Sequence, residues 1–324
     1  MDSWGLIIPQ RAAMFGVASV RELLALAPVA ESSGYFDTVW VGDSLTSKAR
    51  ADSLTLLSVL AGTTESLRLA VGCMASFPVR DPALFAYQWA SLDQVSDGRM
   101  LLAVCNGLQK HADASEIEGR HFGGVRDKER VARLEENLDL VRQLWSGEPT
   151  TFHGRFHQYD DITILPRPVQ ERPRIWISAN PPLGPAADRV LERIATRADG
   201  LLTTRGRPGY LRDLRDALAE PMAAAGRSLA DLPTAAYHSV NIGTDADACL
   251  DEAHRFFGEY YGPHMFDRDG AAAITAVGTP DAVAEQLAEV RREGAGHIGI
   301  RLASWRQEEQ LSLLVEKVLP LLAS

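Results

Sequence analysis

Short apolar runs alternate with longer amphipathic segments along nearly the whole chain, and this alternation is the feature that most constrains the fold. Apolar residues recur at helical spacing in the longer segments. Runs that are apolar on both faces are typical of parallel strands covered by helices on both sides. Eight units of this kind predict closure into a (β/α)8 TIM barrel, an α/β fold. The eight predicted strands span residues 5–8, 38–41, 67–73, 101–105, 174–177, 200–203, 235–242 and 297–302.

A doubly wound open sheet is the competing architecture, because it shows the same alternation. Such a sheet usually carries a G-x-G-x-x-G loop after its first strand, whereas this chain has I-P-Q-R-A-A at 8–13. No long linker divides the chain, so we expect a single domain over residues 1–324. The irregular segments 107–128 and 147–172 are predicted to be loop insertions, one after strand four and one before strand five.

Charge and cysteine content exclude several classes of protein. The chain has 33 Lys plus Arg against 43 Asp plus Glu, a net charge of −10, which disfavours nucleic acid as a partner. We see no signal peptide and no apolar run that could cross a membrane, so the cytoplasm is the expected location. Cys73, Cys105 and Cys249 lie far apart in sequence without C-x-x-C spacing, so we expect neither a disulfide framework nor a zinc site.

The carboxyl ends of the strands are where a barrel places its active site. These ends run from Pro9 and Gln10 after the first strand to Leu302 and Ala303 after the eighth, and most carry small or amide side chains. Asp43 is the one carboxylate among them, and we expect it to cap or brace a loop. We find no metal-binding, nucleophile-elbow or P-loop motif. This lining favours a bound planar cofactor that supplies the chemistry.

Several motifs, in order along the chain, are typical of one protein family. They are V-W-V-G-D at 39–43, L-R-L-A-V-G at 67–72, S-L-D-Q-V-S-D-G-R at 91–99, R-V-A-R-L-E-E at 130–136 and V-G-T-P-D at 277–281. In these motifs the chain resembles the bacterial luciferase-like flavin-dependent monooxygenases. The resemblance implies a TIM barrel that binds reduced FMN or the deazaflavin coenzyme F420.

The resemblance also implies a cofactor site. A bulge at the end of the third strand, often with a non-prolyl cis peptide, would support the flavin ring, and Asn106 would reach the ring edge or the ribityl chain. A phosphate loop would precede a helix N-terminus, where free N–H groups favour an anion, and a nearby arginine would add positive charge. The implied positions are Gly72, Cys73, Met74 and Ala75 for the bulge, Ser178, Ala179, Asn180 and Gly184 for the phosphate loop, and Arg130 or Arg133 for the cation.

The chain departs from the family where acid–base chemistry is concerned. Many members have histidine just after the second strand, and this chain has Ser44. Bacterial luciferase has arginine where this chain has Asn106, and the phosphate loop reads N-P-P at 180–182 in place of a glycine-rich run. Ser44, Cys105 and His111 are the candidate catalytic residues. A cysteine such as Cys105 at a strand end more often packs than reacts.

The expected function is an FMNH2- and O2-dependent monooxygenase that acts on a small organic substrate and receives reduced flavin from a separate reductase. Two alternatives stay open, an F420-dependent hydride-transfer oxidoreductase and a non-catalytic flavin-binding protein. The resemblance further implies a homodimer.

Overall fold

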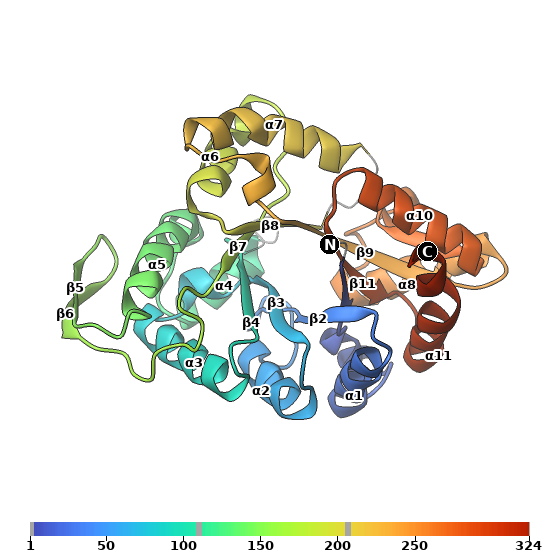
Figure 1. Cartoon of the computed structure of the whole chain (residues 1–324), viewed down its shortest axis with the longest axis horizontal. Helices are drawn as coiled ribbons and strands as arrows, with labels where there is room; N and C mark the ends of the chain where they lie inside the picture. Colours follow the sequence, from blue (N-terminus) through green and yellow to red (C-terminus); the bar gives the residue numbers. More distant parts are fainter. Residues whose placement is uncertain (1–2, 108–111, 205–208, 324) are drawn as a thin grey trace. The chain divides into compact units, whose positions relative to one another are not determined.

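The computed structural model describes residues 3–107, 112–204 and 209–323 (Figure 1). The chain forms two compact units, one of residues 1–40 with 176–324 and one of residues 41–175. We describe each unit by itself. The single-domain organisation expected from the sequence stays a prediction.

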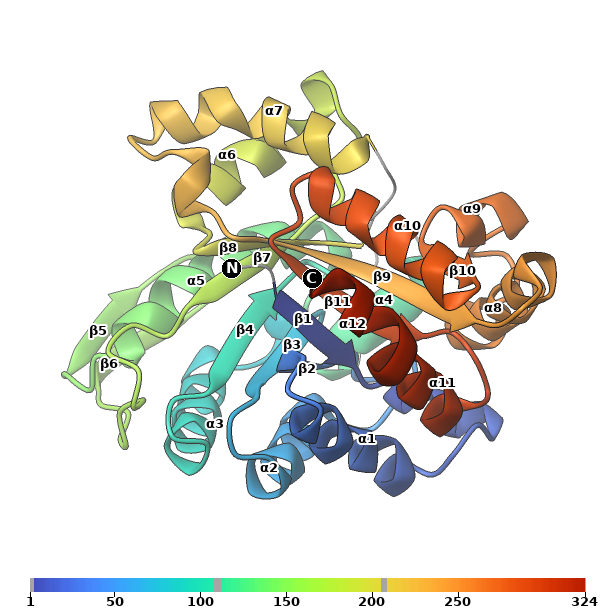
Figure 2. The ribbon, with the colours of Figure 1, turned by 45° about the vertical axis from the view of Figure 1, so that its right-hand side comes forward.

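The first unit is built on parallel strands. β7 pairs with β8, β8 with β9, β9 with β11, β11 with β1, and β1 with β2, so six strands follow one another (Figure 2). A further strand, β10, pairs with the second half of β9 and was not predicted. The strands are β1 (Ser3–Ile7), β2 (Phe36–Val41), β7 (Ile175–Ser178), β8 (Gly200–Thr203), β9 (Thr234–Ile242), β10 (Thr275–Gly278) and β11 (His297–Leu302).

Helices of the first unit connect these strands. Ser19 forms a capping box with Glu22 at the start of the first helix, and Gly34, with φ of 74°, follows the end of that helix. The helices are α1 (Val20–Ser32), α6 (Asp188–Arg197), α7 (Tyr210–Ala224), α8 (Ala246–Tyr261), α9 (Arg268–Ala272), α10 (Pro280–Arg292), α11 (Gln307–Leu313) and α12 (Leu319–Leu322). A π-helical turn, Leu314–Val318, joins the last two, and 3-10 turns lie at Gln10–Phe15, Pro185–Ala187 and Leu229–Asp231.

Glycines on the strands make room for large aromatic side chains in this unit. A Cβ on Gly5 would lie 2.5 Å from Nε1 of Trp40, and a Cβ on Gly200 would lie 2.4 Å from Cε2 of Trp176. Trp40 is fully buried, and its Nε1 donates a hydrogen bond of 3.0 Å to Nε2 of His297. A glycine on one strand therefore leaves space for a tryptophan on the neighbouring strand, as close packing of an interior requires.

The second unit holds β3 (Arg68–Met74) and β4 (Met100–Val104), which pair in parallel. Its helices are α2 (Ser53–Thr63), α3 (Pro82–Val95), α4 (Ala112–His121) and α5 (Arg130–Leu144), with 3-10 turns at Phe77–Val79 and Asp127–Glu129. β5 (Thr150–His153) and β6 (Gln158–Ile162) form an antiparallel hairpin inside the predicted insertion before strand five. With the six strands of the first unit, β3 and β4 complete the eight predicted from the sequence. Within the described ranges, no helix combines the length and apolar character that crossing a membrane requires.

Candidate functional site

The end of β3 carries the predicted bulge. β3 and β4 pair in register from Leu69 to Val71, and the register then shifts before Met74 pairs with Val104. The peptide bond between Gly72 and Cys73 inside this bulge is cis. The sequence therefore predicted the backbone of this region correctly, while the contact of these residues with a cofactor stays a prediction.

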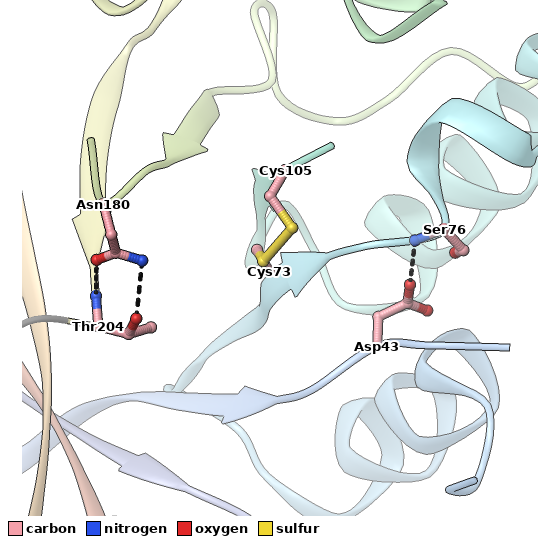
Figure 3. Close-up of a disulfide and its surroundings, with 6 residues drawn as sticks. All are labelled: Asp43, Cys73, Ser76, Cys105, Asn180 and Thr204. Atoms are coloured by element: carbon pink, nitrogen blue, oxygen red, sulfur yellow. Dashed lines mark hydrogen bonds between the residues drawn. A yellow bond between two sulfur atoms is a disulfide. The ribbon is translucent and has the colours of Figure 1, made fainter. Parts of the chain in front are cut away.

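A disulfide joins Cys73 at the bulge to Cys105 just after β4 (Figure 3). The expectation that the cysteines form no disulfide was wrong. The two residues are 32 positions apart in sequence, but neighbouring parallel strands bring their Cα atoms to 5.8 Å. A disulfide sulfur is not a thiolate, so Cys105 cannot act as a nucleophile while it is bonded. Cys249 is free and buried, and burial raises the pKa of its thiol.

Asp43 braces the loops around this strand end. Its Oδ2 accepts a hydrogen bond of 2.8 Å from the backbone N–H of Ser76, in the turn after β3 (Figure 3). Its Oδ1 accepts one of 2.8 Å from the hydroxyl of Ser53 at the start of α2, and Arg80 pairs with it at 3.3 Å. The carboxylate is 1% exposed. Asp43 is therefore a brace, as predicted.

Ser44, the first catalytic candidate, belongs to a loop that is held by Glu118 of α4. Oε2 of Glu118 accepts hydrogen bonds from the backbone N–H groups of Leu45, Thr46 and Ser47 at 2.9, 2.9 and 3.1 Å. The hydroxyl of Ser44 donates to the same oxygen at 3.3 Å. Burial raises the pKa of Glu118, but these donors outweigh burial and hold the pKa below its usual value. Glu118 was not predicted as a site residue, because no motif in the predicted insertion 107–128 distinguishes it from the other acidic residues there.

The structure distinguishes the two candidate cations. Arg130 is fully buried and pairs with Glu118 at 3.5 Å and Asp127 at 3.0 Å. Its Nη1 is buried too and has no hydrogen-bond partner among the described residues. That Nη1 lies 3.0 Å from where a Cβ on Gly107 would stand, beside Asn106. Arg133 instead lies 4.5 Å over the ring of Phe156, at the hairpin turn. Arg130 is therefore the cation at the strand ends, with two carboxylates already balancing its charge.

In the first unit, Asn180 ties the ends of β7 and β8 together. Its Oδ1 accepts a hydrogen bond of 2.9 Å from the backbone N–H of Thr204, and its Nδ2 donates to the hydroxyl of Thr204 (Figure 3). The same Oδ1 accepts a hydrogen bond of 2.8 Å from the hydroxyl of Thr203. Gly184 has φ of 118° at the turn before α6. Asp188 already supplies negative charge in the first turn of α6, which weakens the predicted attraction of a phosphate there.

Asn106 and His111 are the two remaining candidates. Asn106 is half-buried, and in the described part of the chain its side-chain amide makes no hydrogen bond, so it has capacity for a ligand. His111, the third catalytic candidate, lies outside the described residues.

Comparison with known proteins assigns the family. The model of the luciferase-like monooxygenase family matches residues 4–297. An F420-dependent glucose-6-phosphate dehydrogenase from Nakamurella multipartita is 33% identical over 71% of this chain and 66% of its own length. A protein of the same name from Microbacterium testaceum is 28% identical over 93% of both chains.

A solved structure adds the fold. The F420-dependent secondary alcohol dehydrogenase in complex with an F420–acetone adduct superposes with a TM-score of 0.80 over 98% of both chains, at 17% identity. This likeness shows an eight-stranded parallel β-barrel surrounded by helices, as predicted. The family match covers most of the sequence and agrees with the bulge at the end of β3, so the chain belongs to the luciferase-like monooxygenase family of oxidoreductases.

Proposed function

We propose that this protein is an F420-dependent oxidoreductase that transfers a hydride between the deazaflavin and a small organic substrate. The observation that carries the proposal is the match to relatives named as F420-dependent dehydrogenases, one of them over 93% of both chains. FMNH2-dependent monooxygenation, the function first expected, becomes the second candidate. It is supported by the description of the family itself.

The residues at the ends of β3 and β4, in the second unit, are suited to a planar ring. The bulge at Gly72–Cys73 offers a backbone surface, and Asn106 offers an amide without a hydrogen-bond partner in the described residues. In the same unit, the buried Nη1 of Arg130 is a donor for an anionic group, with no hydrogen-bond partner among the described residues. In the first unit, the contact of Ser178 with a cofactor stays a prediction. A deazaflavin held there supplies hydride donation or acceptance at its ring. Asn180 contributes by holding β7 and β8 together.

We do not extend the substrate named for the relatives, glucose 6-phosphate, to this chain. Ser44 stands where many family members have histidine, and its hydroxyl is bonded to Ser47 at 2.8 Å and to Glu118 at 3.3 Å. Because the pKa of Glu118 is lowered, the pair is a weak general base at neutral pH. We therefore propose a small organic substrate without naming glucose 6-phosphate. A homodimer and a cytoplasmic location remain proposals as well.

A fluorescence titration of the purified protein with F420 and with FMN, each oxidised and reduced, tests the proposal. We expect saturable F420 binding at least about tenfold tighter than FMN binding, a difference of about 1.4 kcal/mol. Asn106→Ala should weaken F420 binding, while Gln158→Ala, an exposed amide on β6, should not. Preference for reduced FMN would turn the assignment to monooxygenation, and binding of neither cofactor would refute both candidates.

A further inference from the structure

Arg301 lies at the carboxyl end of β11, one residue before the last residue of the strand. Barrel enzymes place their ligands at this end of the strands. The residue is 8% exposed. Across the described ranges it pairs with no carboxylate, and the one hydrogen bond it donates runs from Nη1 to the hydroxyl of Tyr261. Its Nε is buried and has no hydrogen-bond partner in the part of the chain that the structure describes.

Aromatic side chains hold this guanidinium in place. Cζ of Arg301 lies 4.6 Å from the ring centre of Tyr260 and 5.4 Å from that of Tyr261, both at the end of α8. Tyr237 of β9 is a third tyrosine that interacts electrostatically with it. Burial raises the pKa of Tyr237 far above its usual value, so this phenol stays neutral and gives no counter-charge.

A second deeply buried arginine, Arg130, shows what Arg301 lacks, which is a carboxylate partner. Arg130 is fully buried and pairs with two carboxylates, Glu118 and Asp127. A buried charge without a partner is unfavourable, and aromatic faces compensate only part of that cost. Within the described ranges, Arg301 is thus a buried cation without a carboxylate partner.

The remaining donors define the shape of that partner. A guanidinium has five N–H donors in a rigid fork. Nε and Nη2 form one edge of the fork, and within the described residues neither of them donates a hydrogen bond. Such an edge binds two oxygens of a carboxylate or phosphate side by side. Neutral hydroxyl groups match it less well, because they bring no charge.

We propose that Arg301 binds an oxyanion, the carboxylate or phosphate group of the substrate. As a statement about the substrate, this inference rests on the proposed oxidoreductase function. As a statement about a binding site, it stands on three observations of the described residues: the burial of Arg301, the lack of hydrogen-bond partners at Nε and Nη2, and the lack of a carboxylate beside it.

Calorimetric titration of the full chain without cofactor tests the site directly. Sodium phosphate and sodium acetate serve as separate probes, with sodium chloride holding the ionic strength constant. We expect at least one probe to bind saturably, and Arg301→Met to weaken that binding at least about tenfold. Arg301→Lys keeps the charge and should retain part of it. Binding of phosphate alone identifies a phosphate ester, and binding of acetate alone a carboxylic acid.

Arg291→Met is the matched control. Arg291 also lies over an aromatic ring, 3.7 Å from the ring centre of Trp4, but it belongs to α10. This variant should bind the probes as the wild type does. Binding of neither probe by the wild type, or equal binding by wild type and Arg301→Met, overturns the inference. If Arg301→Met does not fold, as judged by circular dichroism, the wild-type titration and Arg301→Lys decide it.

The F420 titration and the oxyanion titration distinguish failure of the proposed function from failure of the Arg301 site. F420 binding without oxyanion binding keeps the proposed function and refutes the Arg301 site. Oxyanion binding that depends on Arg301, without F420 binding, refutes the proposed function and keeps the site. A phosphate that binds elsewhere is recognised because it persists in Arg301→Met at wild-type affinity, which counts against the inference.

Discussion

Reducing the disulfide between Cys73 and Cys105 should measurably destabilise the protein. The bond joins residues 32 positions apart, and the loop it closes contains all of α3 and the connection to β4. In the chain-entropy description, a cross-link that closes a loop of this length lowers the entropy of the unfolded chain. The corresponding stabilisation is about 4 kcal/mol at 25 °C. Reduction should therefore lower the free energy of unfolding by up to about that amount.

Urea unfolding with and without dithiothreitol measures the effect. The wild type should lose stability on reduction, and the double variant Cys73→Ala with Cys105→Ala should show no response to the reductant. Cys249→Ala is the control, because Cys249 is free and buried and its removal leaves the disulfide intact. This control should keep the full response to dithiothreitol.

Two results would refute the reasoning about the disulfide. One is a thiol titration that finds all three cysteines free in the unreduced native protein. The other is a wild-type free energy of unfolding that does not change on reduction, even though thiol titration shows that the bond has opened. The second result would mean that the folded loop is already fixed by packing and that the cross-link adds no constraint.

Three further predictions concern positions on both units. Because the pKa of Glu118 is lowered in the fold, its contribution to stability is present above pH 4.5 and is lost as pH falls through the folded pKa. Glu118→Gln should therefore flatten the acid side of a stability profile measured by denaturation between about pH 3 and 7, and an unchanged slope would contradict it. Gly5→Ala should cost about 1–3 kcal/mol, because its Cβ would stand 2.5 Å from Nε1 of Trp40. Gly62→Ala in α2, where a Cβ meets nothing within 4 Å, should instead stabilise by about 0.5–1 kcal/mol, and equal urea midpoints for the two variants would count against this packing. Asn180→Ala should lower stability by about 0.5–1.5 kcal/mol, because it removes hydrogen bonds to Thr203 and Thr204 that are part-buried or exposed. An unchanged urea midpoint would contradict this expectation.

The strands could be predicted because each is an apolar run of sufficient length. β11 matches its predicted bounds, and most other boundaries differ by one or two residues. β10 was missed because its sequence, T-A-V-G, has one branched apolar residue among small and polar ones and does not form an apolar run. α4 was missed because A-D-A-S-E-I-E-G-R-H is mostly polar and reads as a loop. Such an element is fixed by its tertiary contacts, here those of Glu118, and local sequence does not contain them.

The site could be predicted only where its signal is local. The bulge at Gly72–Cys73 follows from a continuous motif, so resemblance was enough to predict it. The disulfide depends on which strands are neighbours, and the separation of its cysteines in sequence gave the opposite expectation. The bonds of Glu118 to the loop after β2 link segments more than seventy residues apart, and no spacing rule connects them.

Arg301 shows that strand alternation could have been applied further. Leu302 and Ala303 mark the carboxyl end of the eighth strand in the sequence, and Arg301 is the charged residue before them. Successive side chains of a strand point to opposite faces. His297 contacts Trp40, and a Cβ on Gly299 would lie 2.9 Å from Cδ1 of Tyr237, so alternate residues of β11 share the face of these aromatic side chains. Arg301 is the next residue in that phase. Arginine is almost never fully buried without a partner. A charged residue in phase with an interior face, at the carboxyl end of a barrel strand, is therefore the sequence signal for the oxyanion site proposed at Arg301.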